Sequence, residues 1–227
     1  MAGPDLTLAE QVLLVALDDE KGRDVTQWGS DAGLAAALLL DLARLELVEI
    51  DADGKVAALE GPEPPHELLR AAHAAIGGSA RRRDAKGWVS RLPRELKPLR
   101  ERIARGLVER GILAEQHRRL LGLVPVRRWP AVDAGPEQEL RARLRAVLVG
   151  GDDPTPQEAL LLGLLEPLGL VDGLVERGER RDARRRAKAV AEQGIAGTAV
   201  RDSVRAVQAA VTAAVVTAAV TTTTSSS

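Results

Sequence analysis

Apolar residues recur at helical spacing along most of the chain. In the stretch LKPLRERIARGLVERGIL, Leu99, Ile103 and Leu107 fall on one face of a helix. Pro98 suits the first turn because that position needs no N–H group, and Gly111 is placed to end the helix. The pattern therefore predicts a helix that starts near Pro98 and stops before Gly111.

The same periodicity predicts helices on both sides of this stretch. Thr7 and Thr155 each begin a Thr-x-x-Glu capping box, so we expect helices to run from them to about Leu17 and Leu165. The segment 34–45 is apolar almost all round, which is typical of a helix buried on every side. Further helices are predicted at 66–76, 137–149, 174–192 and 198–220. The last of these is rich in Ala, Val and Thr, which favours packing on the core over a membrane span.

Two segments have the pattern of short β-hairpins. Residues 47–59 alternate around a turn at Asp53-Gly54, a dipeptide that favours a tight hairpin turn. Residues 120–126 read as an apolar hairpin or an exposed loop, because Pro125 excludes a central strand.

Charge is distributed unevenly along the chain. Residues 1–67 carry 4 Lys/Arg and 15 Asp/Glu, a net charge of −11. Residues 68–130 carry 16 Lys/Arg and 5 Asp/Glu, a net charge of +11. Residues 131–227 carry 12 and 13, so that their net charge is −1. A middle third this basic implies an anionic partner, an acidic face within the same molecule, or both.

Composition narrows the chemistry of the chain. Of its 227 residues 45% are hydrophobic and 29% charged, as is typical of a soluble globular protein. It has no Cys, which excludes disulfides, thiolate metal sites and a thiol nucleophile. His66 and His73 are too far apart for a zincin motif, and neither a P-loop nor a GxGxxG sequence occurs. We therefore expect no enzymatic activity, no metal and no cofactor.

A pair of cations stands at the start of the predicted helix after Pro98. Lys97 and Arg100 are three residues apart, so their side chains project together, and the first turn also offers unpaired N–H groups. Two cations there oppose the favourable sign of the helix dipole, and an anion between them would satisfy both, which predicts a phosphate site. The same spacing also fits a solvated helix face with a local ion pair between Glu101 and Arg105, so both interpretations stay open.

The order of these parts is similar to that of a known family. The stretch LTLAEQVLLVALDDEKG, then Trp28, then the segment 34–45 and the stretch RERIARGLVERGIL resemble the Golgi phosphoprotein 3 family, whose domain also occurs in actinobacteria. The resemblance extends from about Leu6 to Val216 and points to a bacterial, actinobacterial-type member. It implies a predominantly helical domain around a buried helical core, with a protruding hairpin. Eukaryotic members bind phosphatidylinositol 4-phosphate at Golgi membranes and link glycosyltransferase tails to coatomer.

The resemblance also implies a set of site residues. The head-group pocket would use Trp28, Lys97 and Arg100. A further pocket Arg of the family falls where this chain has Ala35, and Lys97 itself replaces an Arg. Lysine keeps the positive charge but loses the bidentate geometry of arginine, which affects selectivity for the 4-phosphate.

Two further segments are expected to support membrane contact. The apolar hairpin of the family, which serves oligomer contacts and can reach the bilayer, corresponds to residues 120–126. Four apolar side chains would reach the membrane interface here: Leu121, Leu123, Val124 and Trp129. Residues 77–88 are predicted to form a mobile basic loop. Five arginines are expected to add attraction to an anionic surface: Arg81, Arg82, Arg83, Arg127 and Arg128.

We therefore predict a mainly α protein with a buried helical core, ringed by amphipathic helices, and one or two short β-hairpins. Residues 1–220 would form the Golgi phosphoprotein 3-like domain and residues 221–227 a frayed Thr/Ser tail. The predicted function is non-enzymatic binding of phosphoinositide or other anionic membranes by a cytoplasmic, peripherally associated adaptor. Homo-oligomers and basic peptide tails of membrane proteins are further expected partners.

Two other functions fit parts of the sequence. The acidic first third could dock basic peptides as a protein-interaction adaptor. The order helix, helix, hairpin in residues 8–59 also matches a winged-helix nucleic-acid binder, but a net charge of −11 would repel phosphates. We therefore expect no nucleic-acid partner.

Overall fold

The computed structural model describes residues 6–17, 30–51, 54–120, 124–193, 205–207, 209, 211 and 213. Its helices are α1 (Leu8–Ala16), α2 (Ser30–Arg44), α3 (Glu67–Gly77), α4 (Ala85–Glu95), α5 (Leu99–Glu109), α6 (Gly135–Arg145), α7 (Pro156–Leu165) and α8 (Arg180–Gln193). A π-helical turn (Ala146–Gly150) follows α6, and a 3-10 turn (Val171–Gly173) precedes α8. The strands are β1 (Val48–Ile50), β2 (Val56–Ala58), β3 (Gln116–Leu120) and β4 (Val124–Arg128). The predicted fold class, mainly α with two short hairpins, is confirmed.

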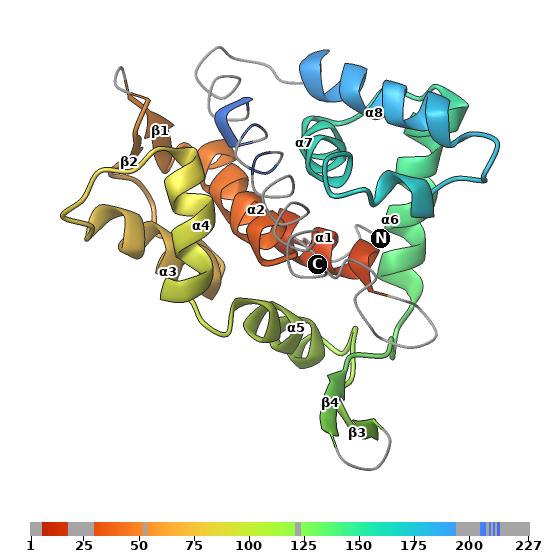
Figure 1. The fold of residues 1–227 in the computed structure, drawn as a ribbon, viewed down its shortest axis with the longest axis horizontal. Helices are drawn as coiled ribbons and strands as arrows, with labels where there is room; N and C mark the ends of the chain where they lie inside the picture. Colours follow the sequence, from red (N-terminus) through yellow and green to blue (C-terminus); the bar gives the residue numbers. More distant parts are fainter. Residues whose placement is uncertain are drawn as a thin grey trace, which may run out of the picture.

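Helix α2 is the centre of the core (Figure 1). Helices α1, α3, α4, α5 and α7 all pack against it. Residues 33–43 are buried without interruption, because Leu and Ala cover the helix on every side. The predicted buried helix is therefore confirmed, and it extends to Ser30 at its start.

The predicted helix ends are also present. Thr7 and Thr155 both form complete capping boxes, with Glu10 and Glu158 as the reciprocal partners. Helix α5 ends at Glu109, and Gly111 then takes a left-handed conformation with φ of 72°. That conformation favours glycine, which explains why the helix stops there.

Both predicted hairpins form isolated two-stranded sheets. Strands β1 and β2 pair antiparallel around a turn in which Gly54 has φ of 70°. In the second sheet, Pro125 pairs opposite Arg119, a position that a proline can occupy because β4 has a free edge. This hairpin projects from the helical body beyond α5 (Figure 1).

The sequence misplaced two helix starts. The basic loop predicted to last until Trp88 ends at Asp84, whose side chain accepts a hydrogen bond from the Gly87 N–H at 2.7 Å and caps α4. Trp88 itself lies in α4 and is buried against the core. The charged helix predicted from residue 174 begins at Arg180, because a 3-10 turn and Gly178 interrupt the chain before it.

The last predicted helix, 198–220, lies mostly outside the described residues. The residues described there, 205–207, 209, 211 and 213, are helical, and Val207 and Val211 are buried. Within the described part of the chain, no helix has the length and apolarity needed to cross a membrane.

A buried carboxylate joins the ends of three helices. Glu10 of α1 is 1% exposed and accepts hydrogen bonds from the Thr7 N–H at 2.8 Å and from Arg110, just after α5, at 3.1 and 3.2 Å. His66, the N-cap residue of α3, places its Nε2 atom 3.8 Å from the same carboxylate. Glu10 therefore caps its own helix and holds the neighbouring ends of α3 and α5.

A second buried carboxylate, Asp41, lies in α2. It accepts a hydrogen bond from the Leu8 N–H at 2.8 Å and one from Arg44 at 3.3 Å. The pKa of Asp41 is raised from 3.8 to about 6, because the effect of burial is larger than the opposite effect of these two hydrogen bonds. Because the folded-state pKa is the higher one, folding takes up a proton between about pH 4 and pH 6, and stability is lost as the pH rises through this range.

Replacing Glu10 with Ala is expected to lower the free energy of unfolding by about 3 kcal/mol, because it removes one partner of a buried ion pair and the acceptor of the Thr7 N–H. Urea unfolding followed by circular dichroism measures this loss. Glu109→Ala is the control, since Glu109 is exposed and pairs with no residue that the structure describes; its effect should stay within about 0.5 kcal/mol. Equal losses in the two variants would contradict the role of Glu10.

Replacing Asp41 with Asn removes the group that titrates but keeps an oxygen for the Leu8 N–H. We expect the stability of Asp41→Asn relative to wild type to rise by up to about 3 kcal/mol between about pH 4 and pH 7. Urea unfolding at both pH values measures the difference. A difference that does not change with pH would contradict a raised pKa for Asp41.

Candidate functional site

Ion pairs between the acidic first third and the basic middle third neutralise part of both charges. Four of them join residues 1–67 to residues 68–130: Arg70–Glu63, Arg82–Asp51, Arg102–Glu67 and Arg110–Glu10. The intramolecular acidic face that the charge pattern allowed is therefore present. The cations that remain without such partners are the ones available to a ligand.

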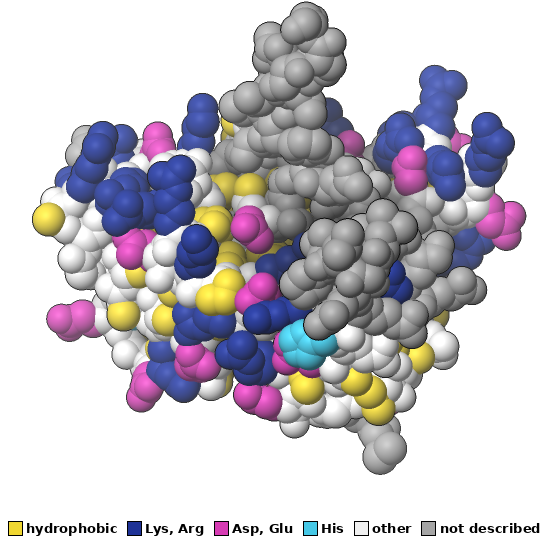
Figure 2. All heavy atoms as spheres, turned by 60° about the horizontal axis from the view of Figure 1, so that its bottom comes forward, with side chains coloured by type: hydrophobic (Ala, Val, Ile, Leu, Met, Phe, Trp, Pro, Cys, Tyr) yellow, Lys and Arg dark blue, Asp and Glu magenta, His cyan; other side chains and the backbone are white. Residues whose placement is uncertain are grey.

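Two of these cations, Arg94 and Lys97, lie at a pocket between the end of α4 and the start of α5. The pocket has a volume of about 600 Å³. Its lining residues are Asp31, Ser90, Pro93, Arg94, Lys97, Pro98, Leu99, Arg100, Glu101 and Trp129. Figure 2 shows Lys and Arg side chains, with some Asp and Glu among them, over the part of this face that holds α3 and α4.

Three cations line this pocket at intervals of three residues. Arg94 and Lys97 are exposed, and neither forms an ion pair with a residue in the described ranges. Arg100 is half-buried, and its guanidinium lies over the ring of Trp129 at 5.6 Å from the centroid. Stacking on a buried ring fixes the position of the Arg100 side chain.

The start of α5 adds hydrogen-bond donors to the same place. Its N-cap residue is Pro98, and no side chain caps the helix. The first-turn N–H groups, which carry the positive end of the helix dipole, therefore receive no hydrogen-bond acceptor from the N-cap side chain.

Two acidic residues limit the positive charge. Glu101 is paired with Arg127 at 2.9 Å, which neutralises it from outside the pocket. Asp31 is exposed at the start of α2. With Glu101 compensated, the exposed cations Arg94 and Lys97 face one carboxylate, Asp31, so the pocket favours an anion.

Comparison with known proteins shows which family the chain belongs to. The family model described as Golgi phosphoprotein 3 (GPP34) matches residues 8–207. The chain belongs to the Golgi phosphoprotein 3 family. The match covers most of the chain and includes every residue that lines the pocket, from Asp31 to Trp129. No curated protein matches the chain.

The structure brings together two of the three head-group residues that the family resemblance implied. Lys97 and Arg100 line one pocket, whereas Trp28 lies outside the described residues. Ala35 is fully buried in α2. Whether Lys97 and Arg100 bind a head group stays a prediction at this point.

The five accessory arginines have different surroundings. Arg81 is exposed and has no ion-pair partner among the residues described. Arg82 pairs with Asp51, Arg127 pairs with Glu101, and Arg83 donates hydrogen bonds within its own loop. Arg128 is half-buried. Among the predicted hairpin contacts, Leu121, Leu123 and the side chain of Val124 lie outside the described residues.

Sequence reasoning did not assign two of the pocket residues. Arg94 was missed, although the spacing Arg-x-x-Lys-x-x-Arg from Arg94 to Arg100 would have indicated it. Trp129 was expected at a membrane interface but is 8% exposed and forms a wall of the pocket. Its stacking with Arg100 joins residues 29 positions apart, and no local pattern predicts such a contact.

Proposed function

We propose that this member of the Golgi phosphoprotein 3 family binds anionic membranes peripherally, as a non-enzymatic protein. Its ligand would be a phosphoinositide head group of the phosphatidylinositol 4-phosphate type. The observation that carries the proposal is the convergence of Arg94, Lys97 and Arg100 on one pocket at the uncapped start of α5.

The pocket offers distinct contacts to a phosphate group. The N–H groups of the first turn of α5 would donate hydrogen bonds, as helix N-termini do toward phosphates. Arg100, held against Trp129, would donate from a fixed position, and Lys97 would act as a mobile point charge. The volume of about 600 Å³ is large enough for an inositol ring beside its phosphate.

Arg94 offers a substitute for the pocket arginine that the family has at the position of Ala35. A buried alanine of α2 provides no donor, whereas Arg94 reaches the same pocket from α4. We infer that this chain keeps three cations at its pocket but arranges them differently, with consequences for head-group selectivity.

A single head group gives only weak membrane binding, so further contacts between the protein and the membrane would strengthen it. Arg81 is exposed and carries unneutralised charge near an anionic surface, worth about 1 kcal/mol. The apolar residues Leu121 and Leu123, which lie outside the described part of the chain, would supply the apolar contact that the sequence predicts.

Two alternative functions, a winged-helix nucleic-acid binder and a protein-interaction adaptor, fit less well than lipid binding. The surroundings of α2 and of the acidic residues favour lipid binding. In a winged-helix protein α2 would enter a DNA groove, but its residues 33–43 are buried in the core. The adaptor alternative uses the acidic first third, where Glu10, Asp51, Glu63 and Glu67 are already engaged by arginines of the same molecule.

Reversing two pocket charges tests the proposal. We expect Arg94→Glu with Lys97→Glu to weaken binding to vesicles containing phosphatidylinositol 4-phosphate by about thirtyfold or more, since each cation contributes about 1 kcal/mol. Both side chains are exposed, so the free energy of unfolding should stay unchanged. Vesicle co-sedimentation and urea unfolding give the two values.

The matched control reverses two exposed cations of α8, Arg181→Glu with Lys188→Glu. Neither residue has an ion-pair partner in the described part of the chain, and neither lines the pocket. If the control loses as much binding as the pocket variant, the attraction is general and the proposed site is wrong.

A further inference from the structure

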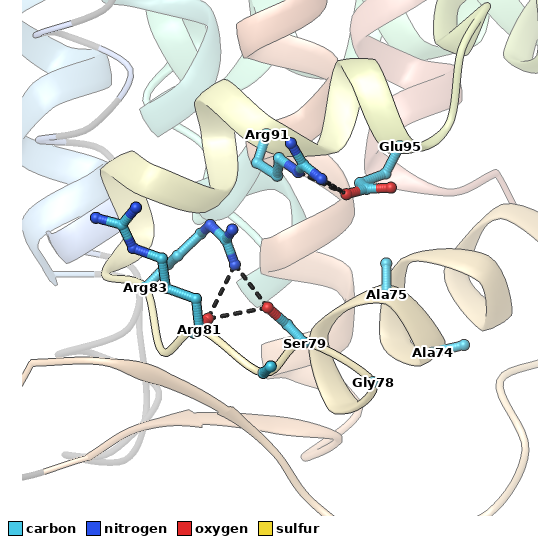
Figure 3. Close-up of a pocket in the computed structure, with 9 residues that line it drawn as sticks. Ala74, Ala75, Gly78, Ser79, Arg81, Arg83, Arg91 and Glu95 are labelled. Atoms are coloured by element: carbon cyan, nitrogen blue, oxygen red, sulfur yellow. Dashed lines mark hydrogen bonds and ion pairs between the residues drawn. The ribbon is translucent and has the colours of Figure 1, made fainter.

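A carboxylate lines each of two pockets that border α4, but its partner differs between them. In the pocket of about 450 Å³ between α3 and α4, Glu95 pairs with Arg91 of the same pocket, and Figure 3 shows the two side chains directed toward each other. In the pocket at the start of α5, Glu101 pairs with Arg127, which does not line that pocket. The negative charge of Glu101 is therefore balanced by a cation from outside the pocket.

The hairpin after α5 brings Arg127 to this place. The Arg127 guanidinium, from β4, donates to the Glu101 carboxylate at 2.9 Å, although the two residues are 26 positions apart in the sequence. Its Nε atom also lies 3.8 Å from the Glu115 carboxylate. Strand β4 is paired with β3, and the Ala114 N–H donates to the Pro130 carbonyl at 2.9 Å at the base of the hairpin. Main-chain pairing thus holds the strand that carries the partner of Glu101.

A nearer cation does not pair with Glu101. Arg105 lies four residues further along α5, which is the spacing of a local ion pair, but it forms no ion pair with any residue that the structure describes. Arg105 is exposed and does not line the pocket. The neutralisation of Glu101 therefore comes from the hairpin and not from its own helix.

The ion pair matters for the charge of the pocket more than for the stability of the fold. Its side chains are 44% exposed in Arg127 and 34% in Glu101, and such exposed pairs contribute little to stability. Without Arg127, Glu101 would join Asp31 as a second carboxylate facing Arg94 and Lys97. Repulsion between a carboxylate and an anionic ligand grows with the charge of the ligand. A phosphate monoester carries about −1.5 to −2 at pH 7 and a phosphodiester about −1, so the monoester would lose more affinity.

We propose that Arg127 is a positioning residue of this pocket. It holds and neutralises the Glu101 carboxylate and thereby sets the preference of the pocket for a phosphate monoester over a phosphodiester. The inference rests on the proposed function, because it requires a head group in the pocket. It adds a determinant of selectivity that lies outside the pocket, on the β3–β4 hairpin.

Two soluble head groups test this role without attraction to a membrane surface. Glycerophosphoinositol 4-phosphate carries a phosphate monoester, whereas glycerophosphoinositol carries only the diester. Arg127→Gln should weaken binding of the first by about fivefold and of the second by less than about twofold, as measured by titration calorimetry. Equal losses for the two head groups would contradict a role in selectivity.

A second substitution shows whether Arg127 acts through Glu101. Glu101→Gln removes the carboxylate that Arg127 neutralises. In this background Arg127→Gln should change the affinity for glycerophosphoinositol 4-phosphate by less than about 1.5-fold. Such a rescue also excludes damage to the fold as the cause of the loss in Arg127→Gln alone. A fivefold loss in both backgrounds would mean that Arg127 attracts the ligand by its own charge, which overturns the proposal.

Arg105→Gln is the matched control. It removes an exposed cation from α5 without releasing a carboxylate of the pocket, because Arg105 has no ion-pair partner in the described part of the chain. Its affinity for glycerophosphoinositol 4-phosphate should fall by less than about twofold. A loss as large as that of Arg127→Gln would show that any cation of this region has the same effect, and the proposal would be wrong.

The outcomes separate this proposal from the proposed function. Repeating the measurements on vesicles that contain phosphatidylinositol 4-phosphate or phosphatidylinositol detects a pocket that binds only at a membrane. Wild-type protein that shows no preference for the 4-phosphate in either form contradicts the proposed function, and this proposal with it. A wild-type preference that Arg127→Gln leaves unchanged contradicts this proposal alone.

Discussion

The Glu10 carboxylate is the contact on which the arrangement of the helices depends. It caps α1, binds Arg110 after the end of α5, and lies beside the His66 ring that caps α3. A carboxylate buried this deeply is stable only with its partners in place, so these helix ends must come together when the chain folds. Helix α5 is anchored at its C-terminal end in this way, and the pocket forms at its N-terminal end.

Ion pairing between the first and middle thirds of the chain also explains why positive charge remains around α4. Acidic residues of the first third neutralise arginines where the two segments meet, at α3, at the β1–β2 hairpin and at both ends of α5. Arg81, Arg94 and Lys97 lie beyond the reach of these carboxylates and remain exposed. A net charge of −1 for the whole chain therefore conceals a local cationic surface.

Local sequence predicted most of the fold because the decisive signals were local. The capping boxes at Thr7 and Thr155, the apolar segment that became α2 and the stop at Gly111 each involve residues within a few positions of one another. Helix α4 was harder to foresee, since Pro93 in its last turn is a residue that usually ends a helix. Its start became clear only from the Asp84 cap and the burial of Trp88.

Only the part of the candidate site that lies at the start of one helix, α5, could be predicted from the sequence. Lys97 and Arg100 could be paired by their spacing at the start of α5, whereas Arg94 belongs to the preceding helix and required the geometry of the turn between them. The contact between Arg100 and Trp129 and the ion pair between Glu101 and Arg127 depend on how the chain after α5 returns to it. Such contacts follow from packing and not from any pattern along the sequence.

The proposed pocket at the start of α5 would bind a specific phosphate group and not anionic surfaces in general. Co-sedimentation with vesicles tests it most directly, comparing phosphatidylinositol 4-phosphate with phosphatidylinositol at low and at physiological salt. A formed pocket predicts binding to the 4-phosphate that survives physiological salt and exceeds binding to phosphatidylinositol. Equal binding to both lipids that disappears at physiological salt would show that the pocket is not a specific phosphate site.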